Sequence, residues 1–226
     1  MMGYIPLFLN VQDAACLVVG GGQTALRKAV MLLEAGARVV AVSPQFTAAF
    51  DDLQSRYGKA LALRHEAYSG GDLSAFQLVF AATNRHGLNR SIAEDARRCG
   101  IWVNVVDEPE LCSAICGAVL NRGPLQIAVS TGGACPTLAV ALRDELGERY
   151  PDWTGVFASV LGSLRGWLLE RCPEMETRKR VLYRLASVEN RDRHAGLEPE
   201  ALLLKLRAEA EQMLRELVVT HTDGDE

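Results

Sequence analysis

A glycine-rich turn between an apolar run and an amphipathic segment is the feature that most constrains this fold. Residues 14–19 (AACLVV) are continuously apolar, and the three glycines of residues 20–22 interrupt the run. In residues 24–35, leucine and alanine then recur at the spacing of one helix face. A continuously apolar run is typical of a strand that is buried on both faces of a sheet. The segment therefore predicts a buried strand, a tight turn and a helix.

The turn carries the pattern G-x-G-x-x-A, which is typical of dinucleotide-binding sites when a strand precedes it and a helix follows. Gly20 permits the tight turn, Gly22 lets the backbone approach a pyrophosphate, and the small Ala25 lets the helix pack close to the strand. Free N–H groups at the start of the helix favour an anion. We therefore predict a dinucleotide cofactor here, and a glycine turn without a ligand is the alternative.

The first half of the chain repeats this alternation. Further strands are predicted at residues 39–42, 60–65, 78–82 and 102–106, and helices at 46–57 and 88–99. The alternation predicts a Rossmann-type α/β fold with a parallel sheet. After residue 107 we expect strands at 113–119 and 125–130, and helices at 136–149, 153–171, 174–188 and 199–219. Residues 189–193 are expected to form a solvated linker and residues 221–226 a frayed tail.

These changes of pattern divide the chain into three parts. We expect a cofactor-binding domain at 1–110, a small segment at 111–150 and an all-helical C-terminal module at 151–226. In the module, an apolar face at helical spacing predicts core or dimer packing. Its residues are Leu161, Leu164, Trp167 and Leu168.

Composition excludes several classes of protein. The chain of 226 residues has a formal net charge of −4, whereas nucleic-acid binding requires clustered Lys and Arg. Its N-terminal apolar stretch is too short for a signal peptide, and no window approaches the ~18 apolar residues of a membrane span. The six cysteines are scattered in a chain too large to need disulfides. We therefore expect a soluble cytoplasmic protein with free thiols that binds neither nucleic acid nor membrane.

Polar residues at the ends of the predicted strands indicate how the cofactor is held. The acidic residue that would bind an adenosine ribose is missing after the second strand, which ends in Ser43-Pro44. Serine still hydrogen-bonds a ribose hydroxyl, and no arginine follows directly to bind a 2′-phosphate, so we favour NAD over NADP. Thr83 and Asn84, which end the fourth strand, are assigned to cofactor contact, as is Asn104 in the fifth.

Asp107 lies just beyond the carboxyl end of the fifth predicted strand, at the edge where open α/β sheets bind ligands. A carboxylate there is suited to accept a proton beside a nicotinamide ring, at a raised pKa if water is excluded. The alternative is a turn or capping aspartate before Glu108-Pro109.

The sequence predicts no metal site. Cys112 and Cys116 have the spacing of a pair, with Cys135 nearby, but no second pair or histidine accompanies them, so we interpret them as buried small hydrophobes. The four histidines share no metal-ligand spacing. His86, in a predicted ligand-side loop, is interpreted as a surface or capping residue.

Several of these segments, taken together, resemble the precorrin-2 dehydrogenases, which also form the N-terminal module of siroheme synthases. The resemblance covers about residues 3–150. It rests on VVGGGQTALRKAVMLLEAGARVVAVSP, VFAATN, NVVDEPELCSA and LQIAVSTGGACPTLA, in that order. The combination of the glycine turn, NVVD and VSTGG is far more specific than any one motif.

The resemblance implies NAD-dependent dehydrogenation of precorrin-2 to sirohydrochlorin, with Asp107 as the general base. It also implies cofactor contacts at Gln23, Thr24, Ser43 and Pro44, and a homodimer built by residues 111–150. Precorrin-2 carries eight carboxylates, which guanidinium groups bind well. The candidates to bind them are Arg122, Arg143, Arg149, Arg165 and Arg171.

Two alternatives stay open. One is a bifunctional enzyme that also inserts Fe²⁺ or Co²⁺ into sirohydrochlorin, and the other is a non-catalytic redox sensor that binds NAD(H). Relatives read S-F-I-x-P shortly after the aspartate, whereas this chain reads Ser113-Ala114-Ile115-Cys116-Gly117. We therefore expect a pocket that is either wider or shaped for a different pose of the tetrapyrrole, which weakens the case for metal insertion more than the case for dehydrogenation.

Overall fold

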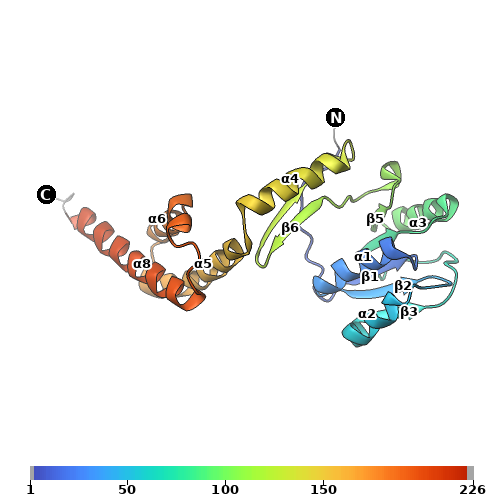
Figure 1. Ribbon diagram of the computed structural model, residues 1–226, viewed down its shortest axis with the longest axis horizontal. Coiled ribbons are helices and arrows are strands. Elements are labelled where there is room, and N and C mark those ends of the chain that lie inside the picture. The colour runs from blue at the N-terminus through green and yellow to red at the C-terminus, as the bar shows by residue number, and fades with distance from the viewer. Residues whose placement is uncertain (1–2, 223–226) are drawn as a thin grey trace. The chain divides into compact units, whose positions relative to one another are not determined.

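A computed structural model describes residues 3–222, with side chains described to residue 216. The chain divides into two compact units, with the boundary between Cys116 and Gly117, and each is described by itself. The first unit is built on a five-stranded parallel sheet in the order β3-β2-β1-β4-β5 (Figure 1). Its strands are β1 (Ala15–Val19), β2 (Arg38–Val42), β3 (Leu61–Arg64), β4 (Leu78–Ala81) and β5 (Trp102–Val105). The Rossmann-type α/β prediction is confirmed.

Helices cover both faces of this sheet, which explains the continuously apolar strands. Cys16 and Val18 of β1 share a core with α1 (Gln23–Glu34) and α2 (Ala49–Tyr57), whereas Leu17 and Val19 share one with α3 (His86–Arg98). The strand order reverses between β1 and β4, and such a switch point is where open α/β sheets bind ligands, at the carboxyl ends of the strands.

The helix predicted to begin at residue 46 begins three residues later because the preceding loop is bonded to the glycine turn. The Thr47 N–H donates to the Gly21 carbonyl at 2.9 Å, and the Ser43 hydroxyl donates to the Gln45 carbonyl at 2.6 Å. These bonds hold residues 43–47 in a compact loop against the start of α1.

A loop without a helix joins β3 to β4, and it is closed against α3. The Tyr68 hydroxyl donates to Asp95 Oδ2 at 2.8 Å, and Asp95 Oδ1 also pairs with Arg98 at 2.6 Å. Burial and the neighbouring carboxylate raise the pKa of Tyr68. Asp95 is only 9% exposed, so its hydrogen bond with Tyr68 is a buried contact that fixes the loop to the C-terminal part of α3.

The second unit begins with an antiparallel hairpin of β6 (Ala118–Arg122) and β7 (Leu125–Val129), followed by α4 (Pro136–Arg149). The prediction of a strand at 113–119 was wrong by about five residues. The Ser113 and Ala114 N–H groups instead donate to the Val103 carbonyl of β5, after a short 3-10 turn, η2 (Pro109–Leu111). Gly123, at φ +63°, and Pro124 make the hairpin turn.

The remaining helices are α5 (Asp152–Arg171), α6 (Met175–Leu185), α7 (Val188–Arg193) and α8 (Pro199–Thr222). The predicted apolar face of α5 packs in the core of this unit, with Leu164 and Leu168 fully buried. The linker predicted at 189–193 is wrong: it is α7, whose N-cap Ser187 accepts from the Asn190 N–H at 3.1 Å. His221 and Thr222 continue α8, and the rest of the predicted frayed tail lies outside the described residues.

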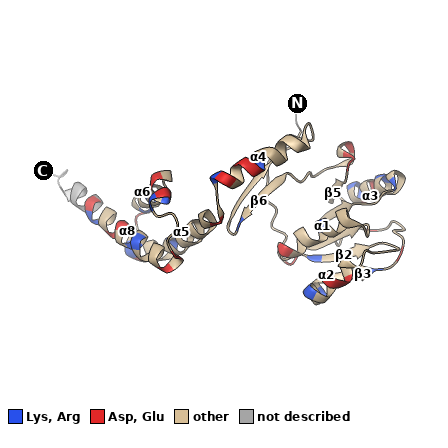
Figure 2. Ribbon diagram, viewed as in Figure 1, with Lys and Arg blue, Asp and Glu red and all other residues tan. Residues whose placement is uncertain are grey.

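Charge is mixed along the helices of the second unit (Figure 2). In α4 the first half carries no charged side chain, and the charges begin at Arg143. Within residues 3–222, no helix is both long enough and apolar enough to cross a membrane.

Candidate cofactor and active site

The three glycines of the turn have different surroundings. Gly20, at φ +134°, approaches β4 so closely that a Cβ would lie 2.3 Å from the Ala82 carbonyl oxygen. A Cβ on Gly21 would lie 1.9 Å from the Gln45 carbonyl oxygen, whereas one on Gly22 would meet no described atom within 4 Å. Gly21 is thus required by the protein's own packing, a role that the sequence pattern does not reveal. Only Gly22 opens onto free space.

The start of α1 offers free backbone donors beside that space. Gly22 is the N-cap residue and supplies no side-chain acceptor, and the first turn holds no acidic residue. Gln23 is exposed, and the half-buried Thr24 hydroxyl accepts from Arg27 Nη2 at 3.1 Å. Unsatisfied N–H groups and the helix dipole favour an anion at such an end. The arrangement fits a pyrophosphate.

The loop after β2 packs against Gly21 of the glycine turn. Ser43 is 9% exposed, and its hydroxyl proton is used by the Gln45 carbonyl, so the oxygen's lone pairs are left to accept a hydrogen bond. Pro44 is exposed. Thr47 Oγ1 is buried with no hydrogen-bond partner among the described residues, although the Thr47 backbone is bonded to Gly21. A buried hydroxyl without a partner beside an open turn fits a polar ligand, and no sequence pattern points to Thr47.

Thr83, at the end of β4, is held by Asn89 of α3. The Thr83 hydroxyl donates to Asn89 Oδ1 at 2.6 Å, and Asn89 Nδ2 donates to the Thr83 carbonyl at 3.1 Å. Asn84 is exposed. Asn89 was not among the residues predicted from the sequence. Its signal was available, because it is a polar residue on the buried face that Ile92, Ala93 and Ala96 form at helical spacing.

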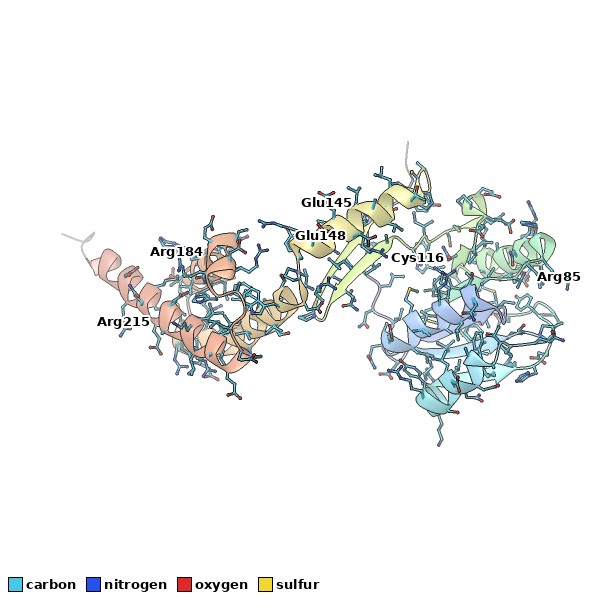
Figure 3. All side chains as sticks on the ribbon, in the orientation of Figure 1. Arg85, Cys116, Glu145, Glu148, Arg184 and Arg215 are labelled. Carbon is cyan, nitrogen blue, oxygen red and sulfur yellow. The ribbon has the colours of Figure 1, made fainter. Side chains whose placement is uncertain are left out.

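Glu108 joins the same network from the end of β5. Its side chain is buried, at 7% exposed, and Oε1 accepts from Asn89 Nδ2 at 3.2 Å and lies 3.2 Å from His86 Nδ1. The Asn89 bond, and to a smaller extent His86, hold the pKa of Glu108 below its usual range against the effect of burial. His86 begins α3 and is largely exposed, which confirms it as a surface histidine. Arg85, just before it, marks this end of the helix in Figure 3.

Asp107 occupies the turn between β5 and η2. Its φ of +62° lies in the left-handed region, which aspartate tolerates better than most residues and which costs of order 1 kcal/mol or more. The side chain is exposed, so nothing in the unit itself excludes water from it. The preceding strand end is fixed by Cys112, whose sulfur accepts from the Val105 N–H at 3.1 Å and lies 3.3 Å from the Val105 carbonyl.

Asn104 is buried at 8% exposed and uses its amide group within the protein. Its Nδ2 donates to the Ala114 carbonyl at 3.0 Å, which ties the segment after η2 back to β5. In this structure its amide group therefore holds the segment after η2 against β5.

The other candidates are dispersed. Cys112 is half-buried, and burial raises the pKa of its thiol. Cys116 is exposed (Figure 3), so the interpretation of Cys116 as a buried hydrophobe was wrong. The reason is that residues 113–117 form no strand. All six cysteines are free, and the part of the chain with described side chains contains no group of three metal-ligating residues. Arg122 is a structural residue: its Nε donates to the Tyr150 carbonyl at 2.9 Å and pairs with Asp152 at 3.1 Å.

Two family models match the chain, one described as NAD(P)-binding over residues 7–118 and one as the central part of sirohaem biosynthesis proteins over 122–149. The chain is 40% identical over 178 residues to a siroheme synthase of Methylococcus capsulatus, covering 79% of this chain and 37% of that one. It is 38% identical over 215 residues to one of Pseudomonas aeruginosa, covering 95% and 44%. The chain thus spans less than half the length of these relatives.

Among solved structures, the chain is similar to that titled SirC, precorrin-2 dehydrogenase. The TM-score is 0.71 at 22% sequence identity, and the match covers 91% of this chain and 100% of that one. At this identity the similarity shows a shared fold over nearly the whole chain.

Proposed function

We propose that the chain is a member of the sirohaem biosynthesis proteins and that it dehydrogenates precorrin-2 to sirohydrochlorin with NAD. The matches to the two family models and to the siroheme synthases support this proposal. The observation that carries the proposal is the pairing of an open glycine turn at the start of α1 with a left-handed aspartate turn after β5. Both lie at carboxyl ends of strands of one parallel sheet. That edge suits a cofactor and a substrate side by side.

The cofactor is assigned to residues from three strand ends. The α1 backbone at Gly22, Gln23 and Thr24 would bind the pyrophosphate, with Gly20 making the turn. Ser43 and Pro44 would contact the adenosine side, and Thr83 the nicotinamide side, where Asn104 supports the strand edge. NAD supplies a hydride acceptor when bound, and the protein's contribution is orientation.

Asp107 is assigned as the general base. Dehydrogenation breaks two bonds to hydrogen in precorrin-2: one hydrogen leaves as a hydride to the nicotinamide ring, and the other leaves as a proton. The Asp107 carboxylate would accept that proton and release it to water. Because the side chain is exposed in the free protein, bound tetrapyrrole itself would exclude water from it.

The test is anaerobic incubation with enzymatically generated precorrin-2 and NAD, followed by the absorbance of sirohydrochlorin. Asp107→Asn keeps the left-handed turn accessible but removes the base, so turnover should fall by about 10²–10⁴-fold while NADH binding is kept. Asp13→Asn is the matched control, because Asp13 is the other described aspartate at positive φ (+57°) and lies in a turn before β1. Normal turnover by Asp107→Asn would refute the assignment.

The same assay separates the alternatives. A further change of the spectrum when Co²⁺ is added, above the uncatalysed control, would establish metal insertion as a second activity. Absence of turnover by a wild-type protein that binds NADH would instead support a redox sensor.

We also propose a cytoplasmic homodimer. Six free thiols suit a reducing compartment. Exposed apolar side chains gather on the hairpin and the uncharged half of α4, where Val119, Leu138 and Val140 are 45%, 50% and 42% exposed. Such a surface is typical of an interface with another chain.

A further inference from the structure

Asn89 connects two loops that are separate in the sequence. It is 2% exposed and takes part in hydrogen bonds on both sides. Toward the loop after β4, Oδ1 accepts from the Thr83 N–H at 3.3 Å and hydroxyl at 2.6 Å, and Nδ2 donates to the Thr83 carbonyl at 3.1 Å. Toward the turn after β5, Nδ2 donates to Glu108 Oε1 at 3.2 Å. One buried side chain therefore holds both loops.

Glu108 is the point where this connection reaches the aspartate turn. It follows Asp107 directly, its carboxylate is bonded to α3 through Asn89 and His86, and its carbonyl accepts from the Leu111 N–H at 3.0 Å. On the other side of Asp107, the Cys112 sulfur fixes Val105. The left-handed residue is thus held from both ends, which is what a sparsely populated backbone conformation requires in order to persist.

The chemistry of the pair suits a rigid link. A buried carboxylate without hydrogen-bond partners raises the free energy of the folded state, and this favours the bond between Glu108 and Asn89. The groups around it are His86 at 3.2 Å and Arg90, both on α3, besides Asn89. All of them favour the ionised acceptor, so the link persists across the neutral pH range.

We propose that Asn89 and Glu108 are positioning residues: their buried hydrogen bond sets the turn that carries Asp107 against the loop that carries Thr83. This inference rests on the proposed function, in which Thr83 serves the cofactor and Asp107 the substrate. A base displaced by about 1 Å loses up to about 10²-fold in rate. Breaking the link should therefore lower kcat through Asp107 and weaken NADH binding through Thr83.

The experiment compares two buried carboxylates, Glu108, which contacts α3 from the turn after β5, and Asp95, which lies in α3 itself. Glu108→Ala breaks the link, and Asp95→Ala removes the carboxylate that Tyr68 and Arg98 bind at the other end of α3. We expect Glu108→Ala to lower kcat at least about tenfold, with little change in KM for precorrin-2, and to raise the Kd of NADH by about threefold or more. Asp95→Ala should lower the Tm to a similar degree with kcat and the Kd of NADH unchanged.

Conservative variants separate positioning from general stability. Glu108→Gln keeps an acceptor oxygen for Asn89, so it should retain kcat within about threefold of wild type. Asn89→Ser keeps a polar residue but cannot span from Thr83 to Glu108, so it should reproduce the pattern of Glu108→Ala and replaces it if that variant does not fold. Unchanged kcat and NADH affinity in a folded Glu108→Ala or Asn89→Ser, or equal losses in Asp95→Ala, would overturn the inference.

The NADH titration tests the positioning role of Asn89 and Glu108 separately from the proposed function. If wild type does not turn over precorrin-2, the proposed function fails. The positioning role is then decided by whether Glu108→Ala and Asn89→Ser, but not Asp95→Ala, weaken NADH binding measured by fluorescence.

Discussion

Gly21 and Gly22 are adjacent in one turn but differ in their surroundings, so a substitution at Gly21 tests packing and one at Gly22 tests cofactor binding. Gly21 is packed against the Gln45 carbonyl, and Gly22 faces open space with an extended backbone (φ −88°, ψ −176°) that any residue adopts. The first is therefore a requirement of folding. The second has no such requirement, so a glycine there points to a ligand.

Gly22→Ala should weaken NADH binding about tenfold or more, because the new methyl group occupies the space assigned to the pyrophosphate. Its effect on stability should stay below about 1 kcal/mol, the scale of an N-cap change. Gly21→Ala should instead lower the free energy of unfolding by about 1–3 kcal/mol through overpacking. Fluorescence titration and urea unfolding measure the two effects. Undiminished NADH affinity in Gly22→Ala would argue against a cofactor at this turn.

Glu108 gives a pH-dependent prediction. Its pKa is lowered in the folded state, so the stability it contributes is fully present above its unfolded pKa and is lost as the pH falls through the folded value. The stability advantage of wild type over Glu108→Gln should therefore be present at pH 5 and decline below about pH 4. Urea unfolding between pH 3 and 5 tests this, with the exposed Glu110→Gln as control. An advantage that grows toward acid would contradict the assignment.

At the scale of elements, α5 carries glycines in contrasting environments. A Cβ on Gly155 would lie 2.0 Å from the Arg122 carbonyl of β6, which shows how closely this helix crosses the hairpin. Gly162 and Gly166 have no such described neighbour within 4 Å. The helix thus needs glycine at one place for packing and tolerates it at the others.

The same substitution should therefore have opposite signs along α5. Gly155→Ala should destabilise the second unit by about 1–3 kcal/mol because the helix must move away from β6. Gly162→Ala and Gly166→Ala should each stabilise it by up to about 1 kcal/mol, since alanine has the higher helix propensity. Thermal unfolding of the variants measures the difference. A stabilising Gly155→Ala would mean that α5 does not pack closely against β6.

Elements were predicted well where their signal is local. The strands of the parallel sheet agree with the apolar runs to within one residue at each end, and α4 agrees at both ends. The strand predicted at 113–119 failed because its first residues bond to β5 instead, a pairing that no local pattern reports. Likewise, the polar residues of 189–193 were predicted to form a linker, but they form α7, which is capped by Ser187 and buries Asn190.

At the scale of the whole molecule, each unit has its own buried core, and the surface of the second unit points to self-association. The first half of α4 combines exposed Leu138, Val140 and Leu142 with an absence of charge, whereas Glu145 and Glu148 lie in its charged half (Figure 3). A helix that exposes such residues would lower its free energy by covering them.

Leu138→Glu combined with Val140→Glu should convert a dimer to a monomer, because two charges would be buried without partners. Light scattering with size-exclusion chromatography measures the mass, and Glu148→Gln on the same helix is the control. NADH binding should survive, since its residues lie in the first unit. A monomeric wild type would remove the basis of the dimer proposal.

The amino-acid sequence by itself determined the parallel α/β fold, the location of the glycine turn and the aspartate at a strand end. These follow from local apolar runs, from glycine spacing and from the order of elements along the chain. Tertiary structure alone decided that Gly21 is a packing residue and that Asp107 is left-handed. It also brought Asn89 to Glu108 across 19 residues. The reason is physical: hydrogen bonds and steric contacts depend on which distant segments meet, and only the folded chain brings them together.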